Sequence, residues 1–492
     1  MSDHSRQSYL LEAMNKGCSN GDAYVTADTL YALCREVRRT VTSRTFRSDL
    51  GTLLHSGALY MEGRRVYLGS IWRYEESAAK DLSSILLHSG FTTEELPETL
   101  RVGSIVLCEE QRNAVATALS NRLTLILGGA GCGKSTLIRS ICDHVTHGGK
   151  VLCAPTGKAA RNLTARTGLP ARTVHSALGL APNDDFLSPV AWNYTKLVIV
   201  DEASMLSLDM LAGILHRAKQ DCRIVLLGDS NQLLSVGVGN VIPDLLLLGV
   251  PVVRLETNHR QASDAYALLQ NVVHFNDLAR AQDLAVDDSF LIHILEHQRA
   301  LRTLIYDASQ RYLNGENIQV LAPLNQMVNE LNQEIREQVN PLVDGKHIIS
   351  ANRFEFRDGD RVMITQNNRD HNCSNGDVGI LHIEKSSYSV ELPDGRCPQW
   401  YDESGLFHLT LAYALTVHKS QGSEYDAVLM PLLMNAHRML SRNLFYTAIS
   451  RGKQQVVLYG DMQAIDVAMQ RALPARKSML VAKAHMQMHR CA

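Results

Sequence analysis

Residues 123–138 read LTLILGGAGCGKSTLI, in which a mostly apolar run enters a glycine-rich turn and then a helix-forming segment. Gly128, Gly133, Lys134 and Ser135 satisfy the pattern G-x-x-x-x-G-K-[ST] of a phosphate-binding loop. Glycines let backbone N–H groups curl around a phosphate, and the N-terminus of the next helix adds the positive end of its dipole. The pattern therefore predicts a strand, a loop and a helix around a bound nucleotide, within an α/β fold.

The side chains of this loop have predicted roles. Lys134 is expected to reach the β- and γ-phosphates of ATP, and the Ser135 hydroxyl is expected to bind Mg²⁺. Cys132 lies just before the helix N-terminus and beside Lys134, and both features can lower a thiol pKa. One hypothesis is therefore a reactive thiol that bound nucleotide protects. The alternative is a small buried residue without a redox role.

Two further segments carry polar residues directly after apolar runs. LVIV is followed by Asp201 and Glu202, which fits a carboxylate that holds Mg²⁺ through water and a second that polarises the attacking water. The next predicted strand ends in GDSNQLL, where the Gln232 amide is placed to contact the γ-phosphate and report its presence. Two arginines in the second half of the chain, Arg260 and Arg451, are candidates to stabilise the transferred phosphoryl group.

Composition excludes several classes of protein. Apolar residues make up 45% of the 492 residues, charged residues 20%, and 49 Lys and Arg nearly balance 51 Asp and Glu. A broadly basic protein that coats duplex DNA is not indicated, although a narrow groove for a single strand remains compatible. No C-x-x-C pair is present among ten cysteines, and no apolar run is long enough to span a membrane. Together with an N-terminus unlike a secretion signal, these features predict a cytoplasmic protein of three or four domains.

The remaining segments suggest how the chain is organised. Strands are predicted over 123–127, 151–154, 197–200 and 223–227, and again over 318–321, 411–416, 427–431 and 455–459. Helical stretches separate most of them, which is typical of parallel sheets covered by helices. Short strands joined by Asn-Gly and Asp-Gly turns occupy the region 346–408. Two helices and a hairpin are predicted over the first 70 residues, where five arginines gather in 35–47; a solvated helix face is favoured over a duplex-contacting one.

Nine segments in order resemble the RecD-like helicases of superfamily 1B. They are EEQRNAV, GGAGCGKST, APTGKAARNL, ARTVHSALG, VDEASM, GDSNQLLSVG, LETNHRQ, YALTVHKSQGSEYD and NLFYTAISRGK, spread over roughly 105–465. The resemblance implies two RecA-like lobes with ATP between them, single-stranded DNA crossing both, and movement from 5′ to 3′. Leu234 stands where the family usually has proline, and the segment that would carry a strand-separating hairpin is short.

The resemblance also implies site residues. Gln111 would read the adenine edge, Glu424 would meet the ribose or phosphates, and Arg260 and Arg451 would contact the γ-phosphate from the second lobe. The implied catalytic residues are Lys134, Glu202, Gln232, Arg260 and Arg451, and the metal ligands are Ser135 and Asp201. The implied nucleotide contacts are Gln111, Gly129, Ala130, Gly131, Cys132, Gly133, Lys134, Ser135, Thr136 and Glu424. The implied DNA contacts are Pro155, Thr156, Lys158, Thr173, His175, Thr416, His418 and Lys419.

The expected fold is α/β, with two RecA-like P-loop lobes, a small β-barrel inserted in the second lobe and an N-terminal winged-helix-like module. The expected divisions are a winged-helix-like module over 1–70, a helical linker over 71–104, lobe 1 over 105–254 with a short hairpin insert at about 180–196, lobe 2 over 255–345 and 409–473, the barrel over 346–408, and a basic tail over 474–492.

The expected function is ATP-dependent 5′–3′ helicase or translocase activity, with ATP and Mg²⁺ as cofactors. Single-stranded DNA and 5′-tailed duplex are the expected substrates of a monomeric motor without membrane contact, and protein partners in a repair, conjugation or defence complex are expected. One alternative is a regulatory ATPase subunit of a larger DNA-processing complex, which stimulation of ATP hydrolysis by single strands would distinguish. Another is a nucleic-acid-binding adaptor whose residues 1–100 alone retain most of the affinity.

Overall fold

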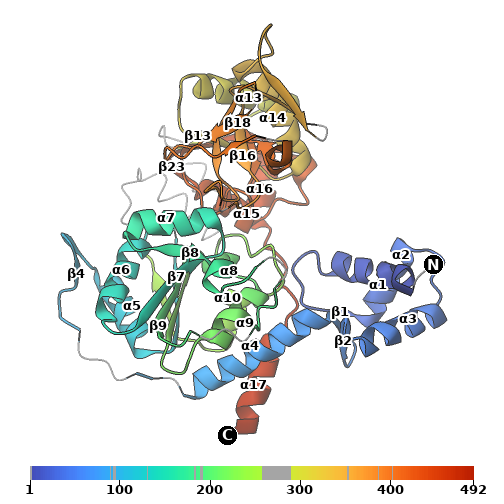
Figure 1. The fold of residues 1–492 in the computed structure, drawn as a ribbon, viewed down its shortest axis with the longest axis vertical. Coiled ribbons are helices and arrows are strands. Elements are labelled where there is room, and N and C mark those ends of the chain that lie inside the picture. Colours follow the sequence, from blue (N-terminus) through green and yellow to red (C-terminus); the bar gives the residue numbers. More distant parts are fainter. Residues whose placement is uncertain are drawn as a thin grey trace.

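The computed structural model describes residues 3–88, 90–91, 96–129, 131–181, 184–188, 192–257, 290–351, 354–368, 370–385, 387–401 and 403–491. A small N-terminal module is followed by two parallel sheets flanked by helices, and an antiparallel region interrupts the chain segments that form the second sheet (Figure 1). Within these residues, none of the helices combines the length and apolar character that a membrane span requires.

The N-terminal module consists of three helices and a small antiparallel sheet in the order β1-β3-β2. Its elements are α1 (Asp3–Gly17), β1 (Val25–Thr26), α2 (Ala27–Val37), α3 (Ser43–His55), β2 (Leu59–Glu62) and β3 (Arg65–Leu68). Thr26 and Thr42 begin α2 and α3, because each hydroxyl accepts the backbone N–H three residues later. Buried residues of the three helices and the sheet form a core of their own, so the module is a packed unit.

Lobe 1 is built on a six-stranded parallel sheet in the order β11-β6-β10-β9-β7-β8. The strands are β6 (Leu123–Gly128), β7 (Gly149–Ala154), β8 (Ala171–Thr173), β9 (Thr195–Val200), β10 (Arg223–Gly228) and β11 (Val252–Leu255). The helices are α5 (Glu109–Ser120), α6 (Lys134–His144), α7 (Gly157–Thr167), α8 (Val174–Ala177), α9 (Leu208–Arg217) and α10 (Val241–Leu247), and a short hairpin, β4 (Arg101–Val102) and β5 (Ile105–Val106), precedes them. The four strands predicted here are confirmed, and β8 and β11 were not predicted.

Lobe 2 has a five-stranded parallel sheet in the order β12-β23-β22-β13-β21. Its elements are β12 (Phe290–Ile294), α13 (His297–Leu313), β13 (Ile318–Ala322), α14 (Asn325–Val339), β21 (Ala414–Thr416), β22 (Tyr425–Leu432), α15 (Arg442–Ile449), β23 (Gly452–Gly460) and α16 (Met462–Gln470). The single strand expected over 411–416 is wrong. The chain leaves the antiparallel region through β20 (Leu409–Leu411) and enters the parallel sheet at β21, so the run is divided between two sheets.

The antiparallel region lies between α14 and β21. It contains β14 (Ile348–Ala351) paired with β15 (Phe354–Arg357), and a five-stranded sheet in the order β19-β18-β17-β16-β20. The remaining strands are β16 (Arg361–Ile364), β17 (Val378–Ile383), β18 (Tyr388–Glu391) and β19 (Gln399–Trp400). Buried Phe356, Tyr388 and Trp400 belong to its core.

The segment expected to carry a short hairpin insert, about 180–196, is described at residues 180–181, 184–188 and 192–196. Of these, only 195 and 196 belong to a strand, β9. Phe186 is buried against lobe 1, where its ring meets Tyr74 at 5.9 Å between centroids and its carbonyl accepts the Arg217 guanidinium at 2.5 Å. The Trp192 indole N–H donates to the Ala177 carbonyl at 3.2 Å. These apolar and polar contacts hold the described part of the segment on the lobe surface.

One helix lies in each of the regions expected as a helical linker (71–104) and a basic tail (474–492), and the two helices pack together; among its described residues, the linker is helical only as far as Leu87. α4 (Gly69–Leu87) buries Ala78, Leu82 and Ile85 in the core of lobe 1. α17 (Leu480–Cys491) runs beside α4 in Figure 1 and adds Leu480 and Ala484 to the same core. The last helix of the chain thus returns from lobe 2 to lobe 1.

A buried ion pair joins these two helices. Lys483 and Glu75, which are 2% and 0% exposed, lie 3.1 Å apart between Nζ and Oε2. The ammonium also lies 5.1 Å from the centre of the Trp72 ring, within the range of a cation–π contact. The Glu75 carboxylate accepts the Met479 N–H at 2.8 Å.

Replacing Lys483 with methionine is expected to lower the free energy of unfolding by about 3–5 kcal/mol, because the Glu75 carboxylate stays buried without its cation. Thermal unfolding of the full chain measures the effect. Lys16→Met is the matched control, since the Lys16–Glu36 pair is more than half exposed and is expected to contribute about 1 kcal/mol or less. Equal melting temperatures for both variants would contradict the structural role of the buried pair.

Candidate active site

The phosphate-binding loop connects β6 to α6, as predicted. Gly131 and Gly133 have φ of 85° and 75°, a region that favours glycine, and Gly133 is the residue before α6. Gly129 is also constrained, because an added Cβ would lie 3.0 Å from the Tyr446 hydroxyl of lobe 2. Ala130 lies outside the described residues. The loop geometry therefore exposes backbone N–H groups at the start of a helix of 11 residues.

Lys134 curls back over the loop. Its Nζ donates to the Gly128 carbonyl at 2.6 Å and to the Gly129 carbonyl at 2.8 Å. The ammonium is therefore held at the mouth of the loop, where phosphate oxygens would compete for it. Gln111 is buried beside the same loop and donates from Nε2 to the Cys132 carbonyl at 3.3 Å, while its Oε1 accepts the Cys108 N–H.

The Cys132 thiol does not have the reactive character that its position suggested. The side chain is 6% exposed, and burial raises the thiol pKa even though Lys134 acts in the opposite direction. The helix N-terminus and the ammonium thus fail to outweigh desolvation. The alternative of a small buried residue describes Cys132 better.

Carboxylates gather at the carboxyl ends of β9 and β10. Burial and the neighbouring Glu202 carboxylate raise the pKa of Asp201 to about 6. Glu202 has φ of 53° and ψ of 41°, a left-handed conformation that costs a residue with a Cβ about 1–2 kcal/mol. Asp229 follows β10 and is buried; its carboxylate accepts the Tyr446 hydroxyl at 2.9 Å.

These groups suit a magnesium ion that ATP brings with it. Mg²⁺ is usually bound by one or two protein oxygens together with phosphates and water. Within the described residues, no group of three or more His, Cys, Asp or Glu side chains is arranged to hold a metal ion. Ser135 is the second residue of α6 and Asp201 directly follows β9, so a hydroxyl and a carboxylate are among the oxygens that could bind the ion.

The lobe 1 loop that contains Gln232 is hydrogen-bonded to lobe 2. The Leu233 N–H donates to the Thr447 hydroxyl at 2.8 Å, and the Asn443 amide donates to the carbonyls of Asn231 and Gln232 at 3.1 and 3.2 Å. The Gln232 side chain is 4% exposed, and its amide lies 3.5 Å from the Asp229 carboxylate. α15 therefore contacts the backbone of the predicted γ-phosphate sensor directly.

Arg451 points into its own lobe. The guanidinium is 3% exposed and donates to the Thr447 carbonyl at 3.1 Å, the Ser450 hydroxyl at 3.1 Å and the Ser423 carbonyl at 3.4 Å. Its predicted contact with the γ-phosphate would require these bonds to exchange. Arg260, the other predicted arginine, lies outside the described residues.

Glu424 forms a contact between the lobes. Its Oε2 lies 2.7 Å from the Arg166 guanidinium of α7. The Asn162 amide, one turn earlier on α7, donates to the Gly422 carbonyl at 2.6 Å, and Arg161 is paired with Asp377 of the antiparallel region. In this structure Glu424 thus joins α7 to lobe 2, and its predicted nucleotide contact stays a prediction.

The predicted DNA contacts follow the strands farther along each sheet. Pro155 and Thr156 follow β7, Thr173 ends β8 with His175 in α8, and Thr416 ends β21 before His418 and Lys419. The hydroxyls of Thr156, Thr173 and Thr416 each accept the backbone N–H three residues later. Three separate turns thus share one hydrogen bond, and Thr156 and Thr173 are also the N-caps of α7 and α8.

Lys158 and His418, in two of these turns, have defined surroundings. The Lys158 ammonium lies 5.5 Å from the centre of the Tyr425 ring in lobe 2. Burial lowers the pKa of His418, and the Arg476 guanidinium lowers it further, which favours the neutral imidazole. A neutral ring can stack on a base, as aromatic side chains do in single-strand sites.

Three families match separate parts of the chain. They are described as an AAA domain (residues 106–295), an ATP-dependent RecD-like DNA helicase SH3 domain (331–391) and a UvrD-like helicase C-terminal domain (411–459). The ATP-dependent RecD2 DNA helicase of Deinococcus radiodurans is 33% identical over 435 residues, which cover 85% of this chain and 58% of that protein. The chain belongs to the RecD-like helicases.

Other relatives of this RecD-like chain agree with that placement. The RecBCD enzyme subunit RecD of Mycolicibacterium smegmatis is 28% identical over 467 residues, covering 84% of this chain and 81% of the relative. The fold also resembles Bacteroides Pif1 bound to single-stranded DNA, with a TM-score of 0.50, 19% identity, and coverage of 74% of this chain and 94% of Pif1. Parallel sheets and an SH3-like domain are thus shown for this α/β chain.

Several site residues of the RecD-like chain escaped sequence reasoning. The end of β10 and the loop after it are hydrogen-bonded to α15 through Asp229, Tyr446, Asn443 and Thr447. Arg166 forms an ion pair with Glu424. The segments GDSNQLL and NLFYTAISRGK were recognised, but their pairing depends on how two lobes meet. The sequence signal available for Asp229 was its position shortly after a predicted strand.

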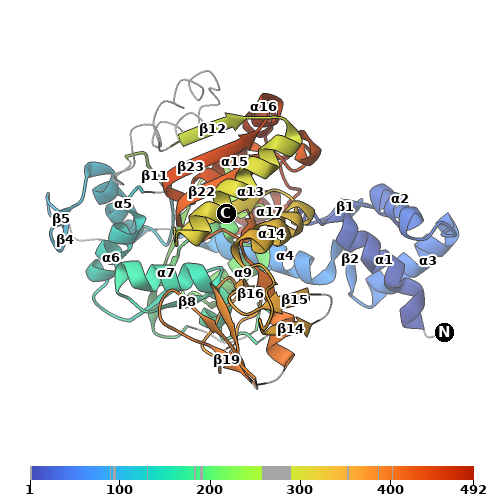
Figure 2. The same ribbon diagram turned by 90° about the horizontal axis from the view of Figure 1, so that it is seen from above.

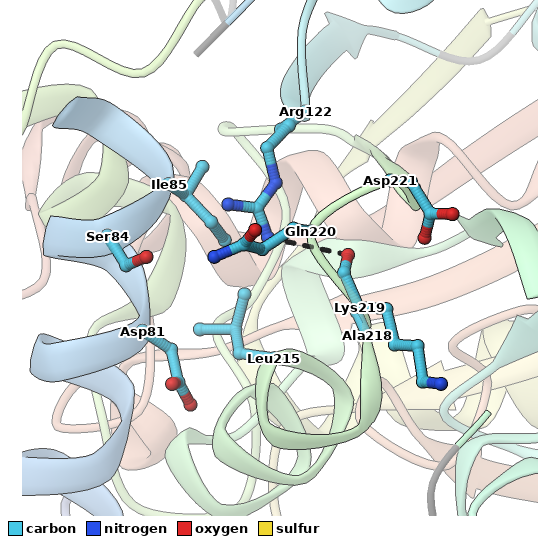
Figure 3. A pocket seen from close by; sticks show the side chains of 9 residues that line it. All are labelled: Asp81, Ser84, Ile85, Arg122, Leu215, Ala218, Lys219, Gln220 and Asp221. Atoms are coloured by element: carbon cyan, nitrogen blue, oxygen red, sulfur yellow. Dashed lines mark hydrogen bonds between the residues drawn. The ribbon is translucent and has the colours of Figure 1, made fainter. Parts of the chain in front are cut away.

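A cavity of about 600 Å³ lies elsewhere in lobe 1, between α4, the end of α9 and the loop 218–221 (Figure 3). Arg122 precedes β6 and Asp221 precedes β10, so the cavity is at the amino ends of the strands. The phosphate-binding loop of this RecD-like chain is at the opposite ends. The cavity is therefore separate from the nucleotide site.

Proposed function

We propose that the chain is an ATP-dependent DNA helicase that moves along single-stranded DNA from 5′ to 3′. The observation that carries the proposal is the direct hydrogen bonding of α15 to the loop 231–233, because it connects the nucleotide site of one lobe to the other. A change at the γ-phosphate then alters the contact between the lobes, which is what a translocating motor needs. The matched relatives named as helicases support the same reading.

The roles of the site residues form part of this proposal. The loop around Lys134 binds the phosphates, Ser135 and Asp201 hold Mg²⁺, and Glu202 polarises the attacking water. Gln111, Gln232, Glu424, Arg260 and Arg451 complete the ATP site between the lobes. Single-stranded DNA follows the turns after β7, β8 and β21, where Pro155, Thr156, Lys158, Thr173, His175, Thr416, His418 and Lys419 lie.

The finer architecture is proposed on the same basis. The order helix, strand, two helices and hairpin supports a winged-helix-like module at the N-terminus. The antiparallel region supports a small inserted barrel, and the two parallel sheets support RecA-like lobes. We retain the proposed domain boundaries, which are 1–70, 71–104, 105–254, 255–345 with 409–473, 346–408 and 474–492. A cytoplasmic, monomeric motor is proposed as well.

A regulatory subunit is the second candidate, because one matched relative is named a RecBCD enzyme subunit. The presence of Lys134, Glu202, Gln232 and Arg451 in one chain favours a working motor over a nucleotide switch. Single-stranded DNA that stimulates ATP hydrolysis in the isolated chain would support the motor. A chain that hydrolyses ATP only with partner proteins would support the subunit.

Strand displacement tests the direction. With ATP and Mg²⁺, the chain is expected to displace the strand of a 5′-tailed duplex and to leave 3′-tailed and blunt duplexes paired, because entry requires a 5′ single strand. A fluorescence-quenching assay on the three substrates gives the result. Displacement of only the 3′-tailed duplex would contradict the direction and the DNA roles assigned to the three turns.

The second-lobe turn provides the control for that experiment. Thr416→Ser keeps the hydroxyl that accepts the Lys419 N–H, so it preserves the turn. Thr416→Ala combined with His418→Ala removes both the hydroxyl and the ring. We expect the double variant to lose displacement and stimulation by DNA, and the serine variant to retain most of both.

A further inference from the structure

The outer end of the N-terminal module carries a concentration of exposed arginines. α2 and α3 lie at the end of the module away from the two lobes in both views (Figures 1 and 2). The exposed arginines there are Arg35, Arg38, Arg39, Arg44 and Arg47. They come from α2, the α2–α3 loop and α3, so three segments of the chain contribute to one basic end. Arg64, in the β2–β3 turn of the same module, is exposed as well.

One face of α3 is buried and apolar, and the opposite face is exposed and basic. Phe46, Leu50 and Leu53 are buried in the core of the module, and Arg44 and Arg47 are exposed one turn apart. The one acidic residue of α3, Asp49, accepts the Tyr9 hydroxyl at 2.8 Å. That contact directs the carboxylate toward α1, so the outer face of α3 presents cations without a competing acid.

The outer face of α3 is also open to close approach. Gly51 lies on it, and a Cβ added there would meet nothing within 4 Å. Among the side chains that the structure describes, no ion pair is recorded for Arg44, Arg47 or Arg64. Arg64 follows Gly63, whose φ of 60° forms the tight turn between β2 and β3. A helix and a hairpin tip thus offer unpaired guanidinium groups.

The inner end of the module is attached to the motor. The Gly239 N–H donates to the Gly21 carbonyl at 2.9 Å, and the Ala23 N–H donates to the Lys477 carbonyl at 2.8 Å. Arg476 donates to the carbonyls of Ser235, Gly237 and Gly239, close to the loop after Gln232. The basic end is therefore held at a defined position relative to lobe 1.

We propose that α3 and the β2–β3 turn bind duplex DNA, with α3 in the major groove and Arg64 on the phosphate backbone. An α-helix fits the major groove, and the second helix of a helix–turn–helix pair is the one that enters it. Arginine forms bidentate hydrogen bonds with phosphates and releases condensed counterions. This assignment deepens the proposed helicase function by giving the double-stranded arm of a tailed substrate its own site, and duplex binding itself requires no ATP.

Fluorescence anisotropy with a labelled blunt duplex, without nucleotide, tests the proposal on the full chain. The variant combines Arg44→Ala, Arg47→Ala and Arg64→Ala. The control combines Arg299→Ala, Arg302→Ala and Arg438→Ala, which removes the same charge from exposed positions of lobe 2. Melting temperatures of the two variants, measured in parallel, verify that the module remains folded.

The triple variant of the module is expected to bind the blunt duplex at least about tenfold more weakly, and the slope of log K against log salt is expected to fall by about 3. The control is expected to bind as the parent does. Unchanged affinity in the module variant, or equal losses in both variants, would overturn the proposal. Failure of the parent to unwind 5′-tailed duplex would contradict the helicase function instead, since blunt-duplex affinity is measured without ATP.

Discussion

Replacing Lys134 with alanine is expected to abolish ATP hydrolysis. The Lys134 ammonium is the cation at the mouth of the phosphate-binding loop, where two loop carbonyls hold it in place. Its removal takes away the positive charge that we propose orients the β- and γ-phosphates and offsets charge in the transition state. Steady-state release of phosphate, with and without single-stranded DNA, measures the loss, and a fluorescent ATP analogue measures binding.

Glu202→Gln is the matched comparison for Lys134→Ala. Glutamine keeps the size of the side chain and removes the carboxylate that is proposed to act on water, so ATP binding should persist while turnover stops. Lys134→Ala should weaken binding as well. Equal loss of nucleotide affinity in both variants would contradict the separate roles of the two residues.

Replacing Arg451 with alanine is expected to lower ATP hydrolysis by about 10³–10⁵, the usual loss when an arginine finger is removed. In this structure the guanidinium is hydrogen-bonded to Thr447, Ser423 and Ser450 of its own lobe, so it must leave these partners before it can act as a finger. Reaching the γ-phosphate would exchange those bonds for contacts with phosphate oxygens. Single-turnover hydrolysis and nucleotide binding, measured on the same preparation, separate chemistry from affinity.

Arg438→Ala is the control for Arg451→Ala, since Arg438 is exposed on lobe 2. A folded Arg451→Ala variant that binds ATP but hydrolyses little supports the proposed finger. Near-parental hydrolysis with DNA would show that Arg451 only stabilises the end of α15. A melting temperature well below that of the control would reveal the structural share of its bonds.

Local patterns were sufficient wherever a motif and its backbone geometry occupy one short segment. The turn around Gly131 and Gly133, the strand before it and the helix after it all follow from adjacent residues. Asp201 and Glu202 were found because an apolar strand delivers them directly to the sheet edge. For Cys132 the sequence identified the correct neighbours but predicted the wrong direction of the thiol pKa shift. Burial raises this pKa, and burial depends on the packed core and not on the adjacent residues.

These local patterns could not predict contacts between segments that are distant in the sequence. Whether 71–87 is a spacer or a core helix depends on α17, about 400 residues later, whose Lys483 completes the ion pair with Glu75. The direction of the Arg451 side chain and the partners of Glu424 likewise depend on how lobe 2 meets α7 and the loop 231–233.

The sequence by itself determined the nucleotide site, the parallel order of strands and helices, and the family, because each rests on residues within one turn, one strand or one motif. Only the tertiary structure decided which polar side chains face one another across the lobes, where α17 packs and which end of the N-terminal module stays uncovered. Those outcomes depend on the burial of apolar faces from separate parts of the chain, and burial is a property of the whole packed molecule.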